Sequence, residues 1–399
     1  MRPRTLVLAC FLGASACAEP LVPEVSGRFT VLAAGDDHTC ALVEDSTAFC
    51  WGSNSSLKLG SGGTELRDSL PQLVSTGFAF TQLVAGRDHT CALTALGTAY
   101  CWGEGGNGQL GKAGTSSAPE PVAVAGGLTF RAITAGVIHT CALTDAGAAY
   151  CWGDNNLKQV GYDTAATTVG TPVPVAGGHT FKMIAAGNYH TCGITSTDDA
   201  YCWGANNFGM LGSGDSVYSS ALPEPVAGGL KFKSIAGGAW HTCAVTTGGE
   251  AYCWGSTDFG LLGTGLPASH NQFTPQHVAG AGHYLSVSLG VRHSCALDVD
   301  GRLSCWGAND ENQLAAVSHD RCVTQPGSSN FVPCALQPIA SAPGHYFQAF
   351  ISGSNHACGL SFNAAAYCWG NNEQGQIGIG SVSTSIASPA RVTDPPRLP

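Results

Sequence analysis

The chain has 399 residues, of which only 11% are charged, whereas glycine (54 residues) and proline (20 residues) are frequent. This composition is typical of a turn-rich β protein and excludes a disordered or coiled-coil chain. The formal net charge of -10 is spread along the sequence, with no acidic tail and no basic stripe. Proteins that bind nucleic acid carry clustered Lys and Arg, so no nucleic-acid partner is expected.

The N-terminal segment has the pattern of an export signal. Arg2 and Arg4 precede a short apolar run at 6–12, and three small residues precede Cys17. The apolar run is too short to span a bilayer, so residues 1–16 are interpreted as a signal peptide. The segment resembles a bacterial lipoprotein signal, in which the Cys after the cleavage point is acylated. It departs from that motif at Ala14, where Leu is most common, so simple secretion after cleavage at Ala16 is the alternative.

The cysteine count supports acylation of Cys17. Eighteen cysteines without the spacing of zinc sites indicate an oxidising compartment. Fourteen of them form seven pairs in the repeats described below, Cys322 and Cys334 form another pair, and Cys10 is lost with the signal. Cys17 is left over, and acylation accounts for a leftover Cys in an exported chain. Residues 17–26 are therefore interpreted as lipid-attachment site and tether of a bacterial envelope protein, at the outer membrane or cell surface. A soluble secreted protein is the alternative.

The sequence HTCALTALGTAYCWG at 89–103 occurs in seven versions. Each version has His two residues before a Cys, a second Cys ten residues after the first, and then Trp-Gly. The repeat length is about 51 residues, except that 63 residues separate Cys295 from Cys358. The excess at 316–336 is interpreted as an inserted loop closed by the Cys322–Cys334 pair.

Each repeat is expected to contribute four strands. The first strand lies between an aromatic residue and a Gly six residues later, as from Phe80 to Gly86. The next two strands carry the Cys pair and are apolar on both faces, as expected for sheets packed against neighbours on both sides. A Gly/Asn loop such as 103–111 leads to a Pro-containing strand such as Pro121–Val122. Because Pro is tolerated at sheet edges, this strand is expected on the outside.

The spacing of each Cys pair predicts the register of its hairpin. If Cys91 lies opposite Cys101, a three-residue loop remains with Gly97 in third place, where such loops favour a left-handed backbone. Directly opposed residues lie close enough for a disulfide, so each pair is expected to close within its own hairpin. Three repeats have another residue in place of the Gly, namely Ser46, Asp198 and Ala364. The expected disulfides are Cys40–Cys50, Cys91–Cys101, Cys141–Cys151, Cys192–Cys202, Cys243–Cys253, Cys295–Cys305, Cys322–Cys334 and Cys358–Cys368.

A repeat of this length with four strands predicts an all-β, seven-bladed β-propeller. The propeller is expected over residues 27–393, followed by a tail at 394–399. A Pro/Val strand occurs at both ends of this region, at 23–25 and at 389–392. Either strand could complete the last blade.

The sequences AGRDHTCAL (85–93), AYCWG (99–103) and NGQLG (107–111) resemble the repeat of the regulator of chromosome condensation family. The resemblance implies a seven-bladed propeller, and the Cys pair resembles a variant found in bacterial secreted and surface proteins. The founding members are nuclear exchange factors for a small GTPase, bind chromatin and use a wedge-like insertion. Here the third repeat has ordinary length, and export would separate the chain from a cytosolic GTPase. Nucleotide exchange is therefore not expected.

The repeated His and Trp residues are interpreted as structural. A ring of His could bind a metal or anion, but propeller symmetry places the rings too far apart for bonds near 2 Å to one ion. Each His is instead expected to hydrogen-bond a neighbouring loop or blade, and each Trp to pack between blades with its N–H on a Gly/Asn-loop carbonyl. No catalytic residue, cofactor or metal is assigned, because the sequence has no nucleophile elbow, phosphate loop or metalloprotease motif. The repeat His residues are His38, His89, His139, His190, His241, His293 and His356.

The loops after each Trp-Gly vary most between repeats. They and the neighbouring turns contain Tyr218, Trp240, His270 and the 322–334 loop, which are the candidate binding-face residues because exposed aromatic residues suit protein recognition. Sequence drift in loops under little constraint is the alternative explanation. The chain is expected to be a monomeric scaffold that binds a protein or another surface macromolecule and contacts the membrane only through its anchor. The alternatives are an inhibitor of a secreted enzyme, or a hydrolase or lyase with its site on one propeller face.

Overall fold

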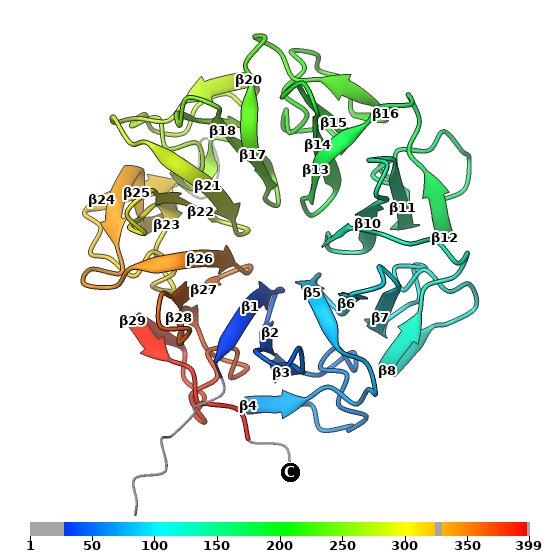
Figure 1. Cartoon of the computed structure of the whole chain (residues 1–399). Coiled ribbons are helices and arrows are strands. Elements are labelled where there is room, and N and C mark those ends of the chain that lie inside the picture. Colours follow the sequence, from blue (N-terminus) through cyan, green and yellow to red (C-terminus); the bar gives the residue numbers. More distant parts are fainter. Residues whose placement is uncertain (1–27, 324–328, 397–399) are drawn as a thin grey trace, which may run out of the picture.

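The computed structural model describes residues 28–323 and 329–396, which form seven antiparallel sheets in a ring (Figure 1). Six sheets have four strands and one has five. The fold is therefore the predicted all-β seven-bladed propeller with about 50 residues per blade. The predicted signal peptide, Cys17 and the tether lie outside the described residues. Within the described ranges, no helix is long and apolar enough to cross a membrane.

Each blade has the same strand order from the axis outwards. The innermost strands begin at the aromatic residue or just after it: β1 (Phe29–Ala34), β5 (Phe80–Ala85), β9 (Ala132–Ala135), β13 (Phe181–Ala186), β17 (Phe232–Gly237), β21 (Tyr284–Leu289) and β26 (Phe347–Ser352). The second strands all begin at the repeat His: β2 (His38–Val43), β6 (His89–Thr94), β10 (His139–Leu143), β14 (His190–Thr195), β18 (His241–Thr246), β22 (His293–Asp298) and β27 (His356–Ser361). The repeat motif thus forms the middle of each blade.

The third and fourth strands complete each blade. The third strands contain the Cys-Trp-Gly sequence: β3 (Ala48–Ser53), β7 (Ala99–Glu104), β11 (Ala149–Asp154), β15 (Ala200–Ala205), β19 (Ala251–Gly255), β23 (Leu303–Ala308) and β28 (Ala366–Asn371). The fourth strands contain Pro: β4 (Arg67–Leu73), β8 (Ser117–Ala123), β12 (Thr168–Pro174), β16 (Ser219–Pro225), β20 (Gln272–His277), β25 (Phe331–Ser341) and β29 (Ser385–Arg391). They lie on the outside, as predicted, but are longer than the short Pro-Val strands expected.

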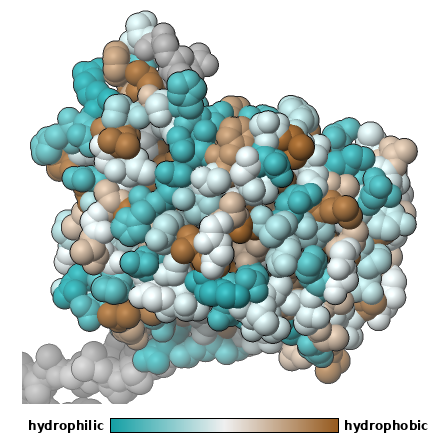
Figure 2. Space-filling model, turned by 90° about the horizontal axis from the view of Figure 1, so that it is seen from above, coloured by the Kyte–Doolittle hydropathy of each residue, from teal (hydrophilic) through white to brown (hydrophobic). Residues whose placement is uncertain are grey.

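Blade 6 carries the insertion as an additional strand. β24 (Asp320–Val323) pairs antiparallel with the first half of β25 and becomes the edge of a five-stranded sheet. The disulfide Cys322–Cys334 links these two strands, with Cα atoms 5.8 Å apart. Figure 2 shows this hairpin projecting from one side of the disk.

The predicted hairpin register is confirmed in all seven blades. Cys91 lies opposite Cys101 and Leu93 opposite Ala99. The seven disulfides of the blades have Cα separations of 4.0 to 4.1 Å. Both cysteines of each of these seven pairs are fully buried, and every residue of β2 and β14 is buried, so the hairpin contacts protein on both faces.

The third loop residue has the left-handed backbone that the register predicts. Gly97 has a φ of 77°. The three repeats without Gly keep the same conformation, with φ of 68° at Ser46, 69° at Asp198 and 64° at Ala364. Those three side chains therefore occupy a conformation that L-residues seldom adopt.

The C-terminal strand completes the last blade, because β29 pairs with β28 of the same repeat. The ring is then closed by contacts between blades 7 and 1. The Phe29 N–H donates to the Ala364 carbonyl at 3.0 Å, and the Trp51 indole N–H donates to the Gln376 carbonyl at 2.9 Å. Pro23 to Val25, the other strand considered for closure, lies outside the described residues.

The antiparallel order divides the loops between two faces of the disk. Loops that join the first to the second strand and the third to the fourth lie on one face, which we call the upper face. Loops that join the second to the third strand, and one blade to the next, lie on the opposite, lower face. The repeat His residues and the inserted hairpin belong to the upper side, which is uppermost in Figure 2.

Candidate binding face

A repeated set of hydrogen bonds joins neighbouring blades below the upper face. At the seam between blades 2 and 3, the Trp152 indole N–H and the Thr140 hydroxyl both donate to the Gln109 carbonyl, at 2.9 and 3.0 Å. The Nε2 atom of His89 lies 2.9 Å from the same hydroxyl. The predicted role of Trp between blades and the predicted hydrogen bonding of His are thus both seen.

The direction of these hydrogen bonds follows from the number of hydrogens on the Thr140 hydroxyl. A Thr hydroxyl has one hydrogen, and at this seam it points to a carbonyl, which can only accept. The hydroxyl must then accept from His89, so the Nε2 atom carries a proton. Burial lowers the pKa of His89 to about 4, so the ring is neutral near pH 7. Five other repeat His rings lie 2.7 to 2.9 Å from a Thr or Ser hydroxyl of the next blade.

The repeat His side chains carry no positive charge near pH 7, and most of their Nε2 atoms are already hydrogen-bonded. Burial lowers the pKa of His139, His241 and His293 to about 3, and that of His89 to about 4. Six Nε2 atoms are occupied by hydroxyl groups. Within residues 28–323 and 329–396, no three His, Cys, Asp or Glu side chains lie close enough together to hold a metal.

One seam lacks the hydroxyl. The residue that follows His356 in blade 7 is Ala357, where the other blades have Thr or Ser. Both ring nitrogens of His293 are consequently buried without a hydrogen-bond partner among the described residues. The Trp369 indole still donates to the Gln313 carbonyl at this seam, at 3.0 Å.

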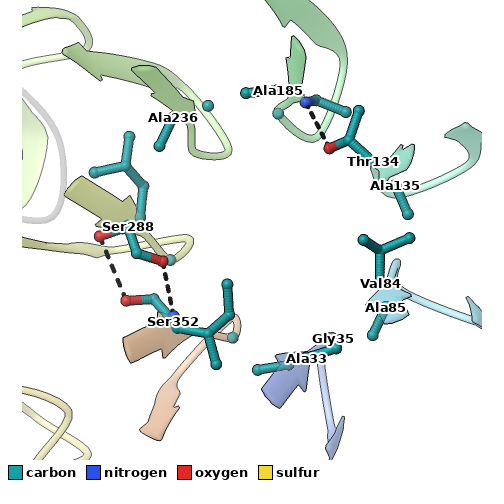
Figure 3. Close-up of a pocket in the computed structure, with 18 of the residues that line it drawn as sticks. Ala33, Gly35, Val84, Ala85, Thr134, Ala135, Ala185, Ala236, Ser288 and Ser352 are labelled. Carbon is teal, nitrogen blue, oxygen red and sulfur yellow. Dashed lines mark hydrogen bonds between the residues drawn. The ribbon is translucent and has the colours of Figure 1, made fainter. Parts of the chain in front are cut away.

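The central channel is lined by the innermost strands and has a volume of about 340 Å³. Figure 3 shows that small side chains such as Ala33, Ala135 and Ala236 face it. The Thr134 hydroxyl accepts from the Ala186 N–H at 3.1 Å, and the Ser288 hydroxyl accepts from the Ser352 N–H at 2.9 Å (Figure 3). These hydroxyl groups are used to join neighbouring blades. We therefore place the candidate binding site in the upper-face loops and not in the central channel.

The upper-face loops of adjacent blades meet in pairs. The residue before the repeat His contacts the Gly/Asn loop of the preceding blade. The rings of Phe208 and Trp240 lie 6.4 Å apart between blades 4 and 5, and the Arg292 guanidinium lies 5.6 Å from the Phe259 ring between blades 5 and 6. These residues give blades 4 to 6 an aromatic sector.

The opposite part of the upper face is charged. The Lys58 side chain is only 1% exposed, and its Nζ lies 2.5 Å from Asp37 and 3.0 Å from Asp88. Burial of Asp88 is outweighed by Lys58 and Arg87, which hold the pKa of that carboxyl below its usual value. Blades 1 and 2 therefore carry a fixed charge cluster, whereas the aromatic sector contains Arg292 with its partners Asp310 and Glu311 at 2.7 and 3.0 Å.

The inserted hairpin stands beside the aromatic sector. A 3-10 turn, η1 (Asp258–Gly260), lies in the loop of blade 5 and contacts both strands of the hairpin. Val332 of the hairpin packs with Phe259 and Trp240 in one small apolar cluster. Phe331 on the other side of the same strand is 49% exposed. The aromatic sector and the hairpin thus form one continuous surface, which we call the aromatic platform.

The predicted binding-face residues Trp240, Tyr218 and His270 all belong to the upper face but do not form one group. Trp240 lies in the aromatic platform. Tyr218 and His270 lie at the ends of the upper loops of blades 4 and 5, just before β16 and β20, and both are exposed. Sequence reasoning missed Phe208, Phe259 and Arg292. Alignment of the repeats would have found them, because they occupy two positions whose residue differs from repeat to repeat, one in the loop and one before the His.

The fold and its seams define a class of protein: a repeat propeller with a nearly repeated interior and loops that vary between blades. The chain belongs to the regulator of chromosome condensation (RCC1) repeat family. The model of the RCC1-like domain matches residues 12–265, and models of the RCC1 repeat match residues 248–297, 284–313 and 352–376.

Curated relatives support the same family. The Ultraviolet-B receptor UVR8 of Arabidopsis thaliana is 31% identical over 370 residues, which cover 88% of this chain and 79% of the receptor. The E3 ubiquitin-protein ligase HERC2 of Mus musculus is 28% identical over 364 residues, which cover 88% of this chain but 6% of the ligase. The match to HERC2 therefore concerns a small part of that protein.

Solved structures share the fold at low identity. Prp20p from Saccharomyces cerevisiae, studied for its binding to Gsp1p and histones, superposes with a TM-score of 0.76 at 22% identity, covering 92% of this chain and 87% of that one. Human WBSCR16 gives a TM-score of 0.76 at 18% identity, covering 87% and 94%. These similarities concern the fold alone.

Proposed function

We propose that this chain is an exported, lipid-anchored scaffold that binds a protein partner through the aromatic platform. The observation that carries the proposal is the contrast between the two parts of each repeat. The seams repeat with nearly the same residue types, whereas the platform is built from positions whose residue differs between repeats. Departures that place Trp, Phe and Arg together on a surface are typical of protein-binding hot spots.

The platform has features that suit a protein partner. Trp240 is partly exposed, and Phe208 and Phe259 hold it on two sides. The Cys322–Cys334 disulfide restrains the adjacent hairpin, so less conformational entropy is lost when a partner binds. Carboxylates outnumber cations on the upper-face loops, which favours a partner with basic residues around an apolar centre.

Export is supported by the disulfides. All sixteen cysteines of the described residues are paired. Disulfides of this number are typical of oxidising compartments. Cys17 is the remaining cysteine after the predicted signal peptide, and its acylation would place the propeller at the envelope. The relatives named above, a receptor among them, are consistent with a binding role.

The partner is tested by affinity capture on the envelope of the native host. Wild type is expected to retain a protein that Trp240→Ala loses, because truncation removes the centre of the platform. Phe362→Ala, a truncation on the lower face, is the control and should retain the same protein. Retention unchanged by Trp240→Ala would contradict the proposal. If the captured protein is an enzyme that wild type inhibits, the scaffold acts as an inhibitor. Turnover of a glycan or metabolite with no protein retained would favour a hydrolase or lyase.

The anchor is tested separately by metabolic labelling with a fatty acid. Wild type should incorporate the label and Cys17→Ser should not, with both chains exported. Absence of label in exported wild type would favour a soluble secreted protein.

A further inference from the structure

The lower face has an uneven distribution of exposed apolar side chains. Those that are large and well exposed lie in loops or strand ends of blades 2, 6 and 7, on both sides of blade 1. Leu96, at the tip of the blade 2 hairpin, is 84% exposed, and Phe362, in the hairpin of blade 7, is 66% exposed. Those that are at least 45% exposed are Phe78, Leu96, Leu285, Val299, Tyr346 and Phe362, which we call the apolar sector.

The lower loops of blades 3 to 5 are polar. The hairpin tip of blade 3 has Ala146 at the position that Leu96 occupies in blade 2. In blade 4, Asp198 pairs with Lys182 and Asp199 pairs with Lys231. On the lower face, the large exposed apolar tips of the loops therefore lie on one side of the ring.

The chain enters the propeller in the middle of the apolar sector. β1 begins at Phe29 on the lower face, and Cys17 precedes Arg28 by eleven residues. At 3.3 to 3.6 Å per residue, this segment reaches roughly 40 Å when fully extended. An acyl chain on Cys17 would therefore keep the apolar sector within reach of the bilayer.

We propose that the apolar sector docks on a phospholipid bilayer and orients the propeller with its aromatic platform away from the membrane. The inference rests on the proposed anchor at Cys17. Aliphatic and aromatic side chains enter the headgroup region of a bilayer favourably. A single anchor tethers without orienting, whereas the apolar tips on either side of blade 1 supply further contacts. The upper face, with Trp240 and the hairpin, then remains accessible to a partner.

The charges of the sector do not require an anionic membrane. Arg28 pairs with Glu44 at 3.4 Å, and Arg302 pairs with Asp300. Because the cations already have carboxylate partners, the expected contact is with the apolar and interfacial part of the lipid. A zwitterionic bilayer is therefore the suitable probe.

Tryptophan fluorescence provides the experiment. The seven repeat Trp residues are 0% exposed, and Trp240 lies on the upper face, so the native emission should be insensitive to lipid quenchers. The lipidated full chain with Leu96→Trp or Phe362→Trp is reconstituted into vesicles of brominated phosphatidylcholine. We expect the added emission to be quenched relative to vesicles of the same lipid without bromine.

The matched control is Ala146→Trp, which adds Trp at the equivalent tip in the polar sector. Tyr218→Trp reports the upper face. Neither should be quenched. Equal quenching at Leu96→Trp and Ala146→Trp, or no quenching at Leu96→Trp and Phe362→Trp, overturns the proposal. The latter result would also follow if the sector bound a protein or a second copy of the chain.

Failure of the anchor is distinguishable from failure of the orientation. If wild type incorporates the fatty acid but the emission of the added Trp residues is not quenched, the anchor is retained and the apolar sector is rejected as a membrane contact. If wild type is not labelled, the anchor fails, and the full chain carrying Cys17→Ser and Leu96→Trp is mixed with the brominated vesicles. Quenching of that chain supports the docking of the sector without the anchor, and its absence rejects the docking.

Discussion

At the scale of single residues, one hydroxyl group at each complete seam has two roles. Thr191 donates to the Gln159 carbonyl at 3.1 Å and lies 2.9 Å from His139 Nε2. It therefore fixes the tautomer of a buried ring and joins two blades. A buried polar group without its partner costs roughly 1–3 kcal/mol, so the hydroxyl is expected to matter more than its size suggests.

The seam between blades 6 and 7 can be repaired by one substitution. Ala357→Thr places a hydroxyl where the six other blades have one, between His293 and the Gln313 carbonyl. We expect the free energy of unfolding to rise by about 1 kcal/mol, the usual net value of a buried hydrogen bond. Equilibrium urea unfolding with the disulfides intact measures it.

The reverse change provides the control for that prediction. Thr191→Ala removes the hydroxyl that His139 hydrogen-bonds, so His139 would lack a partner as His293 does. This change should lower the free energy of unfolding by roughly 1–3 kcal/mol. A Thr at 357 that lowered stability would show that the seam has closed around Ala and has no room for the hydroxyl.

The third residue of the hairpin loop offers a second pair of substitutions. Ala364→Gly removes the left-handed strain of an L-residue, about 1–2 kcal/mol, and adds the flexibility cost of Gly, about 0.5–1 kcal/mol. We expect a net gain of roughly 0 to 1.5 kcal/mol in the free energy of unfolding. Gly97→Ala should destabilise, because a Cβ there would lie 2.7 Å from the Phe130 carbonyl oxygen. Thermal melting of both variants tests the pair, and a loss of stability in Ala364→Gly would be the contrary result.

At the scale of the elements, the eight disulfides differ in their surroundings. Cys141 and Cys151 lie in the middle of a blade, with both side chains buried. Removing this link as Cys141→Ala with Cys151→Ala should cost about 2–3 kcal/mol by the chain-entropy estimate for a loop of this length. Urea unfolding of the double variant is the measurement.

The disulfide of the inserted hairpin should behave differently. β24 pairs only with β25 and can open without breaking the ring. Cys322→Ser with Cys334→Ser should leave the urea midpoint of the propeller nearly unchanged but increase the rate of proteolysis within the hairpin. Equal loss of stability in the two double variants would show that the hairpin unfolds together with the ring.

The elements also show what could be predicted from the sequence. Strand order, register and disulfides follow from a motif whose spacing is kept seven times, because hairpin geometry is local. Phe208 and Trp240 could not be paired in the same way. They belong to different repeats, and their contact depends on the angle between blades. Likewise, the choice of β29 to complete blade 7 depends on ring closure, which two similar Pro/Val sequences leave open.

At the scale of the whole molecule, both faces of the disk are divided into sectors. On the upper face, aromatic residues of blades 4 to 6 oppose the charge cluster of Lys58, Asp37 and Asp88. On the lower face, the apolar sector surrounds blade 1 and the polar loops lie across the ring. The seams are nearly symmetric, so the asymmetry arises from the loops. A symmetric scaffold can therefore present different surfaces without a change in its interior.

The ring of buried His makes the stability of the whole propeller depend on pH. Burial lowers the pKa of these groups in the folded chain, to about 3 at His293 and about 4 at His356, whereas an unfolded His has a pKa near 6.5. Between these values the unfolded chain binds more protons, so stability rises with pH in this window. Above about pH 6.5 both states are neutral and the dependence on these groups ends.

We therefore expect the urea midpoint to fall as the pH is lowered from 6.5 towards 4. Each buried His contributes a slope of at most about 1.4 kcal/mol per pH unit. His293→Leu tests one His side chain alone, because His293 has no hydrogen bond to lose among the described residues. In this variant, the free energy of unfolding should depend less steeply on pH, by the amount that corresponds to about one proton. Seven rings acting together would produce a steep acid transition from groups that are individually far apart. A midpoint that is flat between pH 6.5 and 4 would mean that the rings take up protons in the folded state, which the burial of their Nδ1 atoms without a hydrogen-bond partner among the described residues opposes.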